Sequence, residues 1–194
     1  MARPREFDRE EALDHAMRVF WEKGYAATST DELLSAMNIG RQSLYNAFGD
    51  KRRIYLEALE RYQSKSISRH IDNLNGPASP LGGLQALLLD LTPEKNGDDP
   101  QGCMGVNAIC EFGADDEELA ALRSRSAPAL GRHLLVRIRE GQRAGELDAQ
   151  LDAREIAAFV QMTMQGIQVA SRAGATSKAL RAMATFVIDR LRAR

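Results

Sequence analysis

Three polar residues at the start of one short predicted helix have side chains suited to reading DNA bases. Arg41, Gln42 and Ser43 stand together at the amino end of residues 41–48. An arginine guanidinium can donate two hydrogen bonds to guanine O6 and N7, and a glutamine amide can pair in the same way with adenine N6 and N7. The pattern therefore predicts a recognition helix whose polar end faces base edges.

Neighbouring residues offer donors for the DNA backbone. Tyr45 and Asn46 lie one helical turn further on, where a hydroxyl and an amide suit phosphate oxygens better than base discrimination. Lys51 opens the next predicted helix, so its charge adds to the positive end of that helix. Thr30 stands at the start of the preceding helix. We predict that these four side chains contact phosphates.

Two short helices must position these side chains. The segment Thr28-Ser29-Thr30, followed by two acidic residues, is a helix start, and Asn38-Ile39-Gly40 ends that helix after about two turns. The recognition segment follows at once, and Leu44 and Phe48 form an apolar spine against the preceding helix. This is the spacing of a helix-turn-helix. Each polar residue taken singly fits a solvated surface position, and only their combination favours a DNA contact.

Helix signals continue along the chain, and no alternating strand pattern is present. Asp8 is a suitable N-cap for a first helix and Gly24 a suitable stop, while Leu13, Met17 and Phe20 recur at core spacing. The further predicted helices span residues 8–23, 51 to about 73, 81–91, 103–112, 116–144, 153–173 and 177–192, with loops at 77–80 and 92–100. Pro128 within the longest of them predicts a kink or an interruption. The class is all-α.

Three segments together resemble the DNA-binding signature of the TetR family of transcriptional regulators. They are Phe20-Trp21-Glu22-Lys23-Gly24-Tyr25, Thr28-Ser29-Thr30-Asp31-Glu32-Leu33 and the run from Gly40 to Lys51, and the match covers roughly residues 8–56. The resemblance implies a homodimeric repressor of double-stranded operator DNA, without enzymatic activity. Two residues depart from the family pattern: Gly40 stands where a capping Ser or Thr is frequent, and Gln42 where a small residue is frequent, which suggests a distinct operator preference.

The last two predicted helices indicate a partner subunit. Their apolar residues spread round more than one face, and a helix that needs two buried faces must be covered from both sides. We predict an N-terminal three-helix helix-turn-helix domain over residues 1–56, joined to a C-terminal helical bundle over 57–194 that senses a ligand and dimerises. The predicted interface residues are Phe159, Ile167, Met183, Phe186 and Val187.

Composition limits where the DNA contact can come from. The chain has 194 residues, is 44% hydrophobic and 27% charged, and carries a net charge of −1. Residues 1–60 hold nine basic and eleven acidic side chains, so any attraction to DNA must be local rather than a bulk effect. No apolar run reaches the length of a membrane span, and no signal peptide is apparent at the start. We expect a cytoplasmic protein with no membrane partner.

Two cysteines are candidate sensors. Cys103 and Cys110 lie seven residues apart, hence on roughly the same side of one predicted helix. Free cysteines are most often small buried hydrophobes, and the alternative is a thiol that responds to redox or electrophilic signals. Cys103 is the better candidate because a helix N-terminus favours the thiolate.

An unknown small-molecule effector is also expected to bind among the C-terminal helices, although apolar residues at helical spacing are more often simple core. The candidate pocket or sensor residues are Cys103, Met104, Ile109, Cys110, Phe112, Met162 and Gln165. No cofactor and no metal site is expected, since His15, His70 and His133 are scattered over different predicted helices.

Three functions remain open. The first is a regulator released from its operator by a small-molecule or thiol-reactive effector. The second is a DNA-binding dimer without a sensor, which predicts a solidly packed C-terminal domain. The third is an all-α enzyme or adaptor with an incidental helix-turn-helix, which predicts no salt-dependent DNA binding.

Overall fold

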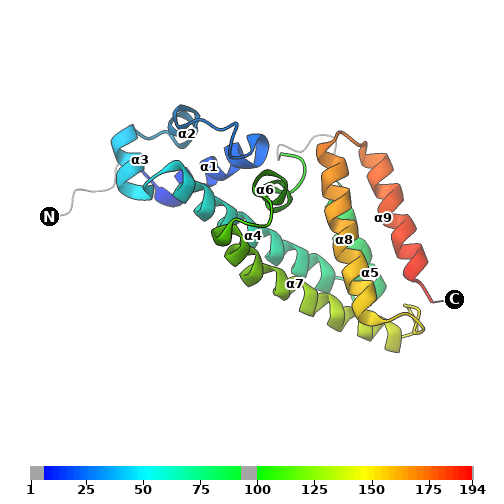
Figure 1. The fold of residues 1–194 in the computed structure, drawn as a ribbon. Helices are drawn as coiled ribbons and strands as arrows, with labels where there is room; N and C mark the ends of the chain where they lie inside the picture. The colour runs from blue at the N-terminus through cyan, green and yellow to red at the C-terminus, as the bar shows by residue number, and fades with distance from the viewer. Residues whose placement is uncertain (1–6, 93–99, 194) are drawn as a thin grey trace. The chain divides into compact units, whose positions relative to one another are not determined.

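The backbone is built from α-helices (Figure 1). The computed structural model describes residues 7–92 and 100–193, and within these ranges it has nine α-helices and only one isolated β-bridge, between Leu147 and Arg192. The all-α prediction is confirmed. Most of the predicted loop 92–100 lies outside the described residues. In the part of the chain that is described, no helix combines the length and the apolarity that a membrane crossing requires.

The helix boundaries follow the predicted ones closely. They are α1 (Arg9–Lys23), α2 (Thr30–Met37), α3 (Arg41–Phe48), α4 (Lys51–Asn75), α5 (Pro80–Asp90), α6 (Met104–Phe112), α7 (Glu117–Arg143), α8 (Ala153–Arg172) and α9 (Ser177–Leu191). Pro128 lies inside α7, which runs through it without an interruption.

Caps explain why the first helices begin and end where they do. The Asp8 carboxylate accepts hydrogen bonds from the backbone N–H of Glu10 and Glu11, at 2.8 and 3.2 Å, so α1 starts with its free N–H groups satisfied. Gly24 ends α1 with φ +82°, a conformation that favours glycine. Ser29 and Glu32 form a reciprocal capping box at the start of α2.

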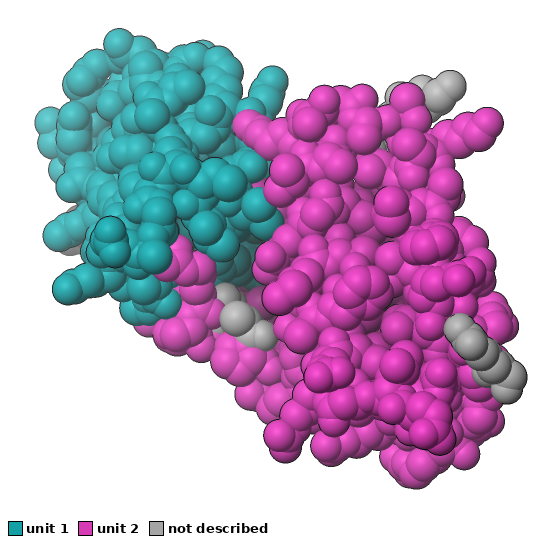
Figure 2. All heavy atoms as spheres, turned by 45° about the vertical axis from the view of Figure 1, so that its right-hand side comes forward, with its two compact units in different colours: residues 1–63, 104–122 teal, residues 64–103, 123–194 magenta. Residues whose placement is uncertain are grey.

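Two compact units make up the chain (Figure 2). The first comprises residues 1–63 and 104–122, and the second comprises residues 64–103 and 123–194. Helix α6 therefore belongs to the same unit as α1, α2 and α3, although more than fifty residues separate it from α3 in the sequence. Helices α4 and α7 each contribute to both units. The functional division predicted at residue 56 stays a prediction.

The first unit has an aromatic core. Leu13, Met17 and Phe20 on α1 are buried, as predicted. Phe20 meets Tyr55 of α4 edge to face, with the ring centroids 5.1 Å apart, a geometry that aligns the positive ring edge with the negative face. Leu33 of α2 is fully buried as well. This core holds α1 and α4 together beneath the two short helices.

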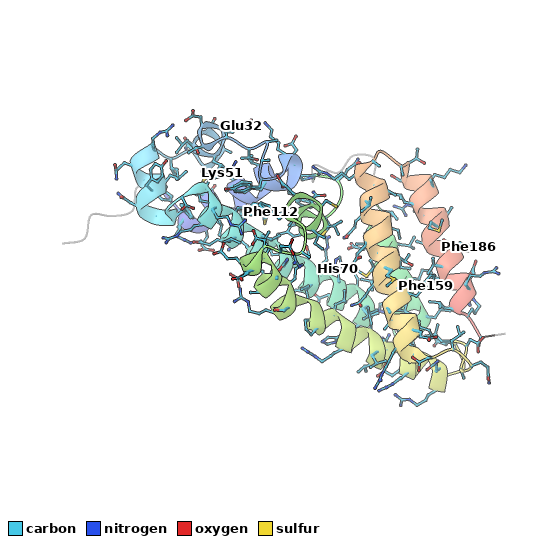
Figure 3. The ribbon with its side chains drawn as sticks, viewed as in Figure 1. Glu32, Lys51, His70, Phe112, Phe159 and Phe186 are labelled. Atoms are coloured by element: carbon cyan, nitrogen blue, oxygen red, sulfur yellow. The ribbon has the colours of Figure 1, made fainter. Side chains whose placement is uncertain are left out.

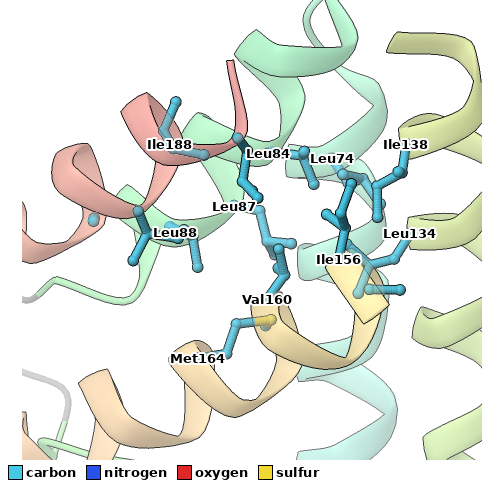
Figure 4. Close-up of a cluster of buried hydrophobic side chains, with 14 of the residues drawn as sticks. Leu74, Leu84, Leu87, Leu88, Leu134, Ile138, Ile156, Val160, Met164 and Ile188 are labelled. Carbon is cyan, nitrogen blue, oxygen red and sulfur yellow. The ribbon is translucent and has the colours of Figure 1, made fainter. Parts of the chain in front are cut away.

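The second unit has an aliphatic core (Figure 4). Leu84, Leu87 and Leu88 of α5 lie at its centre, between side chains from α4, α7, α8 and α9. Helix α5 approaches α4 closely at Gly83, where an added Cβ would lie 2.1 Å from the Leu74 carbonyl oxygen. Any larger residue at Gly83 would push these two helices apart.

Candidate nucleic-acid interface

Helices α2 and α3 form the predicted helix-turn-helix. Each has eight residues, and only residues 38–40 separate them. Asn38 takes a left-handed conformation with φ +53°, and its N–H bonds to the carbonyl groups of Leu34 and Ser35. Asparagine tolerates this conformation better than most residues, so α2 can end directly at Asn38. Leu44 and Phe48 are buried and hold α3 by its apolar spine, as predicted.

The opposite face of α3 is open to solvent. Arg41, Gln42, Tyr45 and Asn46 are exposed, and Ser43 is half-buried. Tyr45 keeps 48% of its surface exposed, an unusual position for a large aromatic side chain. The N-cap residue Gly40 makes no side-chain hydrogen bond to α3, so the backbone N–H groups of the first turn remain available to a ligand. The predicted contact residues thus share one accessible face.

Two polar interactions organise that face. Arg41 Nη2 lies 2.6 Å from Asp31 Oδ1 of α2. Within α3, Gln42 Nε2 donates a hydrogen bond at 3.0 Å to Asn46 Oδ1, which lies one helical turn further on. The Arg41 and Gln42 side chains are therefore held in defined positions, and each would have to exchange its partner to bind a base.

The predicted phosphate contacts flank α3. Thr30 and Lys51 are half-buried at the starts of α2 and α4. The Lys51 ammonium lies 4.2 Å from the centroid of the Tyr25 ring, a cation–π contact that limits where the lysine side chain can point. Tyr25 follows the last residue of α1 by two positions, so the turn between α1 and α2 positions this cation (Lys51 is labelled in Figure 3).

An ion pair between Lys23 and Glu32 spans the same turn. Lys23 Nζ lies 2.5 Å from Glu32 Oε1, and this hydrogen bond, followed by those from the Ser29 backbone and side chain, lowers the pKa of Glu32 to about 2. Glu32 is thus ionised at any physiological pH. Its position in the capping box and its bond to Lys23 join the end of α1 to the start of α2.

Sequence reasoning missed several residues that fasten this unit together. Arg9 donates to Glu57 Oε2 at 2.6 Å, and its guanidinium lies 4.4 Å from the Phe48 ring centroid. Arg52 Nη2 contacts both carboxylate oxygens of Asp116 at 2.7 Å. The partners lie 39 to 64 positions apart, so no local pattern signals them.

The two cysteines differ in exposure. Both are free thiols; Cys103 is half-buried directly before α6, and Cys110 is exposed in the last turn of α6. Met104 is buried in the first unit, and the Phe112 ring packs against the Tyr25 and Tyr55 rings with centroids 5.3 and 5.6 Å apart. Met104 and Phe112 therefore pack in the unit that carries the helix-turn-helix.

The remaining predicted pocket residues are exposed. Ile109 on α6 keeps 43% of its surface accessible, and Met162 on α8 keeps 69%. Gln165 is exposed on α8 as well. Met162 and Gln165 are thus open to solvent within their own unit, and their place in an effector pocket stays a prediction. Within the described residues, no cluster of three or more His, Cys, Asp or Glu side chains offers a metal site.

The predicted dimer residues fall into two groups. Phe159 on α8 and Met183 and Phe186 on α9 are about half exposed, at 46, 52 and 55% (the two phenylalanines are labelled in Figure 3). Ile167 and Val187, in contrast, belong to the chain's own core, with 3 and 4% exposed. Each helix turns one apolar face inward and leaves another open. Ile167 and Val187 therefore face the chain's own core, which helical spacing alone does not reveal, and their place in a dimer interface stays a prediction.

Family models cover both halves of the chain. The model for bacterial regulatory proteins of the tetR family matches residues 12–58, and the model for the tetracyclin repressor-like C-terminal domain matches residues 86–187. The HTH-type transcriptional repressor ComR of Escherichia coli (strain K12) is 31% identical over 183 residues, which cover 92% of this chain and 86% of ComR. The chain belongs to the TetR family. It is a DNA-binding transcriptional regulator of that family.

Other relatives agree with this assignment. The uncharacterised HTH-type transcriptional regulator YezE of Bacillus subtilis (strain 168) is 29% identical, over 77% of this chain and 78% of its own. A solved structure of a cysteine mutant of the TetR family regulator CifR, complexed with 26-bp double-strand operator DNA, is 32% identical with a TM-score of 0.80, over 98% of this chain and 100% of that one. Reduced Escherichia coli NemR shares the fold, with a TM-score of 0.80, 17% identity and 95% and 97% coverage.

Proposed function

We propose that this TetR-family regulator is a homodimeric repressor that binds operator DNA through α3 and is released by a small, thiol-reactive effector. In this proposal residues 1–56 bind DNA, residues 57–194 sense and dimerise, and the protein acts by binding rather than by catalysis in the reducing cytoplasm. The observation that carries the proposal is the accessible polar face of α3, opposite a fully buried spine.

Direct base contacts are assigned to Arg41, Gln42 and Ser43. The first two present bidentate donors at the amino end of α3, which is the end that enters the major groove in a helix-turn-helix. Tyr45, Asn46, Lys51 and Thr30 are assigned to phosphates, which fix the position of the protein on the duplex without reading sequence. The CifR mutant complexed with operator DNA supports this assignment because it is 32% identical to this chain.

A second copy of the chain is the proposed cover for the outer faces of α8 and α9. Phe159, Met162 and Val169 recur along α8 at helical spacing and are 46, 69 and 51% exposed. Met183 and Phe186 add to this surface from α9. Exposed apolar side chains in such a contiguous set mark an association surface. A symmetric pair then presents two α3 helices, which read half-sites about 34 to 36 Å apart.

The proposed signal is alkylation at Cys103 or Cys110. Cys103 is half-buried directly before α6, and Cys110 is exposed and accessible to reagents in solution. The thiolate sulfur attacks an electrophilic carbon, a sulfur–carbon bond forms, and the leaving group departs with its electron pair. The adduct then shifts the protein away from its DNA-binding conformation, provided that the two conformations accept it unequally.

The test compares operator affinity before and after alkylation. A DNA fragment selected by the reduced protein is titrated in gel shifts with the reduced protein and with protein treated with iodoacetamide, alongside Cys103→Ser and Cys110→Ser variants. We expect alkylation to weaken binding of the wild type and to leave the variant that lacks the responsive thiol unaffected. Unchanged affinity in all three alkylated proteins would leave a DNA-binding dimer without a thiol sensor.

A further inference from the structure

Helix α6 is bonded to the turn that begins the helix-turn-helix. The Glu111 carboxylate accepts the backbone N–H of Tyr25 at 2.9 Å through Oε2 and that of Ala26 at 2.5 Å through Oε1. Both oxygens of one side chain thus hold two consecutive N–H groups between α1 and α2. Gly24 makes room for this contact, since an added Cβ there would lie 3.1 Å from Glu111 Oε2.

The bonded turn leads directly to a predicted phosphate contact. Tyr25 donates its backbone N–H to Glu111 and places its ring under the Lys51 ammonium. Three residues therefore connect α6 with the start of α4 next to the recognition helix. All three belong to the first compact unit, so the connection lies within one body.

The other unit ends directly before α6 and resumes within α7, after residues 113–122 of the first unit. Residues 64–103 precede α6 and residues from 123 onward follow it in the second unit, which holds the proposed dimer surface. Cys103 is the last residue before the boundary, and Cys110 immediately precedes Glu111. Cys110 is thus adjacent to Glu111 in the sequence, and Cys103 lies eight positions before it.

We propose that Glu111 is the positioning residue through which α6 controls the α1–α2 turn and, through Tyr25, the orientation of Lys51 toward DNA. Hydrogen bonds suit this role because they weaken steeply with angle and distance. The apolar contacts of Phe112 with Tyr25 and Tyr55, in contrast, are non-directional and tolerate sliding. The identity of α6 as the moving element rests on the proposed function, whereas the effect of Glu111 on the turn does not.

Glu111→Gln is the test variant, since it keeps the side-chain size and removes the charge and one acceptor. Asp115→Asn is the matched control. Asp115 is an exposed carboxylate just after α6, and its substitution changes the charge by the same amount. Amide hydrogen exchange is measured on full-length protein, free and bound to operator DNA. Coupling between two sites is reciprocal, so if α6 controls the α1–α2 turn, DNA binding next to that turn must also affect α6.

In the wild type and in Asp115→Asn, we expect operator binding to slow exchange at Tyr25, Ala26 and the α6 amides. In Glu111→Gln, we expect faster exchange at Tyr25 and Ala26 in the free protein. We also expect that operator binding no longer slows exchange at the α6 amides. A merely structural role would speed exchange without removing the operator effect. An operator effect on α6 that is equal in Glu111→Gln and wild type would overturn the proposal.

A second measurement separates this proposal from the thiol sensor. The ratio of operator dissociation constants for alkylated and reduced protein is expected to reach about fivefold or more in the wild type, the lower end of usual allosteric coupling, and to fall toward one in Glu111→Gln. If alkylation changes nothing in the wild type while the exchange result holds, the thiol sensor is wrong and the role of Glu111 stands. If alkylation releases Glu111→Gln as fully as wild type, the role of Glu111 is wrong.

Discussion

Asp31 and Arg41 form an ion pair across the helix-turn-helix, with Arg41 Nη2 2.6 Å from Asp31 Oδ1. Both side chains are more than half exposed, at 80 and 57%, so the pair contributes little to folding. The pair bears on the proposed DNA contact, because the guanidinium proposed to read a base is already engaged by a carboxylate on the neighbouring helix.

Replacing Asp31 by Asn is therefore expected to strengthen operator binding. The change frees the Arg41 guanidinium and removes a negative charge near the proposed phosphate contacts. Because charges at the rim of an interface act mainly through long-range electrostatics, we expect the affinity to rise about threefold to tenfold at low salt. Fluorescence anisotropy titrations at two salt concentrations measure this. A weaker complex with Asp31→Asn would mean instead that Asp31 is needed to hold Arg41 in its base-reading position.

Lys51→Ala is expected to weaken binding to all DNA sequences about equally. A phosphate contact carries no sequence information, so specificity should stay unchanged while the slope of log affinity against log salt falls by about one unit. The slope is obtained from titrations between low and physiological salt. Arg181→Ala, at an exposed cation on α9, is the control that should leave the slope as it is.

Much of this interface follows from local sequence signals. The cap at Asp8, the stop at Gly24 and the spine of Leu44 and Phe48 each depend on neighbours a few residues away, and the structure has them all. The bond from Glu111 to Tyr25 spans 86 positions, and nothing in a helix pattern reveals which distant backbone N–H a surface carboxylate will reach.

The proposed dimer surface shows the same limit. Spacing identified α8 and α9 as helices with two apolar faces, yet it could not say which face the chain itself covers. The core side chains around Leu84 and Leu88 decide this, and they cover Ile167 and Val187 while Phe159 and Phe186 stay open. Only the packed unit separates the two faces.

Phe186→Glu is expected to give a folded monomer. Phe186 is 55% exposed and its ring lies 5.1 Å from the Arg190 guanidinium carbon, at the surface rather than in the core, so a charge there blocks association more than folding. Analytical ultracentrifugation measures the mass, and circular dichroism the helix content. Val136→Glu on α7, at an equally exposed apolar position of 55%, is the control that should remain dimeric.

Acid is expected to destabilise the second unit through His70. Burial lowers the pKa of His70 from 6.5 to about 4, with a smaller contribution from the Arg69 charge. The unfolded chain takes up a proton near its ordinary pKa and the folded chain does not, so stability is complete above pH 6.5 and is lost as the pH falls toward 4. The shift corresponds to a loss on the order of 3 kcal/mol.

Urea unfolding of wild type and His70→Gln between pH 7 and 4.5 tests this prediction. Other groups titrate in both proteins alike, so the difference between the two pH profiles isolates His70. We expect the wild type to lose more stability than the variant as the pH falls. The 6% exposure of His70 indicates a desolvated side chain, and parallel profiles would contradict this.

Selection of bound sequences from random DNA tests most directly whether α3 of two subunits reads DNA through its exposed polar face. We predict that the wild type enriches a pseudo-palindrome with half-sites one helical turn apart, or a multiple of it. Arg41→Ala should lose its preference at one symmetry-related base pair in each half-site and keep the rest. Enrichment of the same sequences by both proteins, or of no sequence by either, would contradict the account.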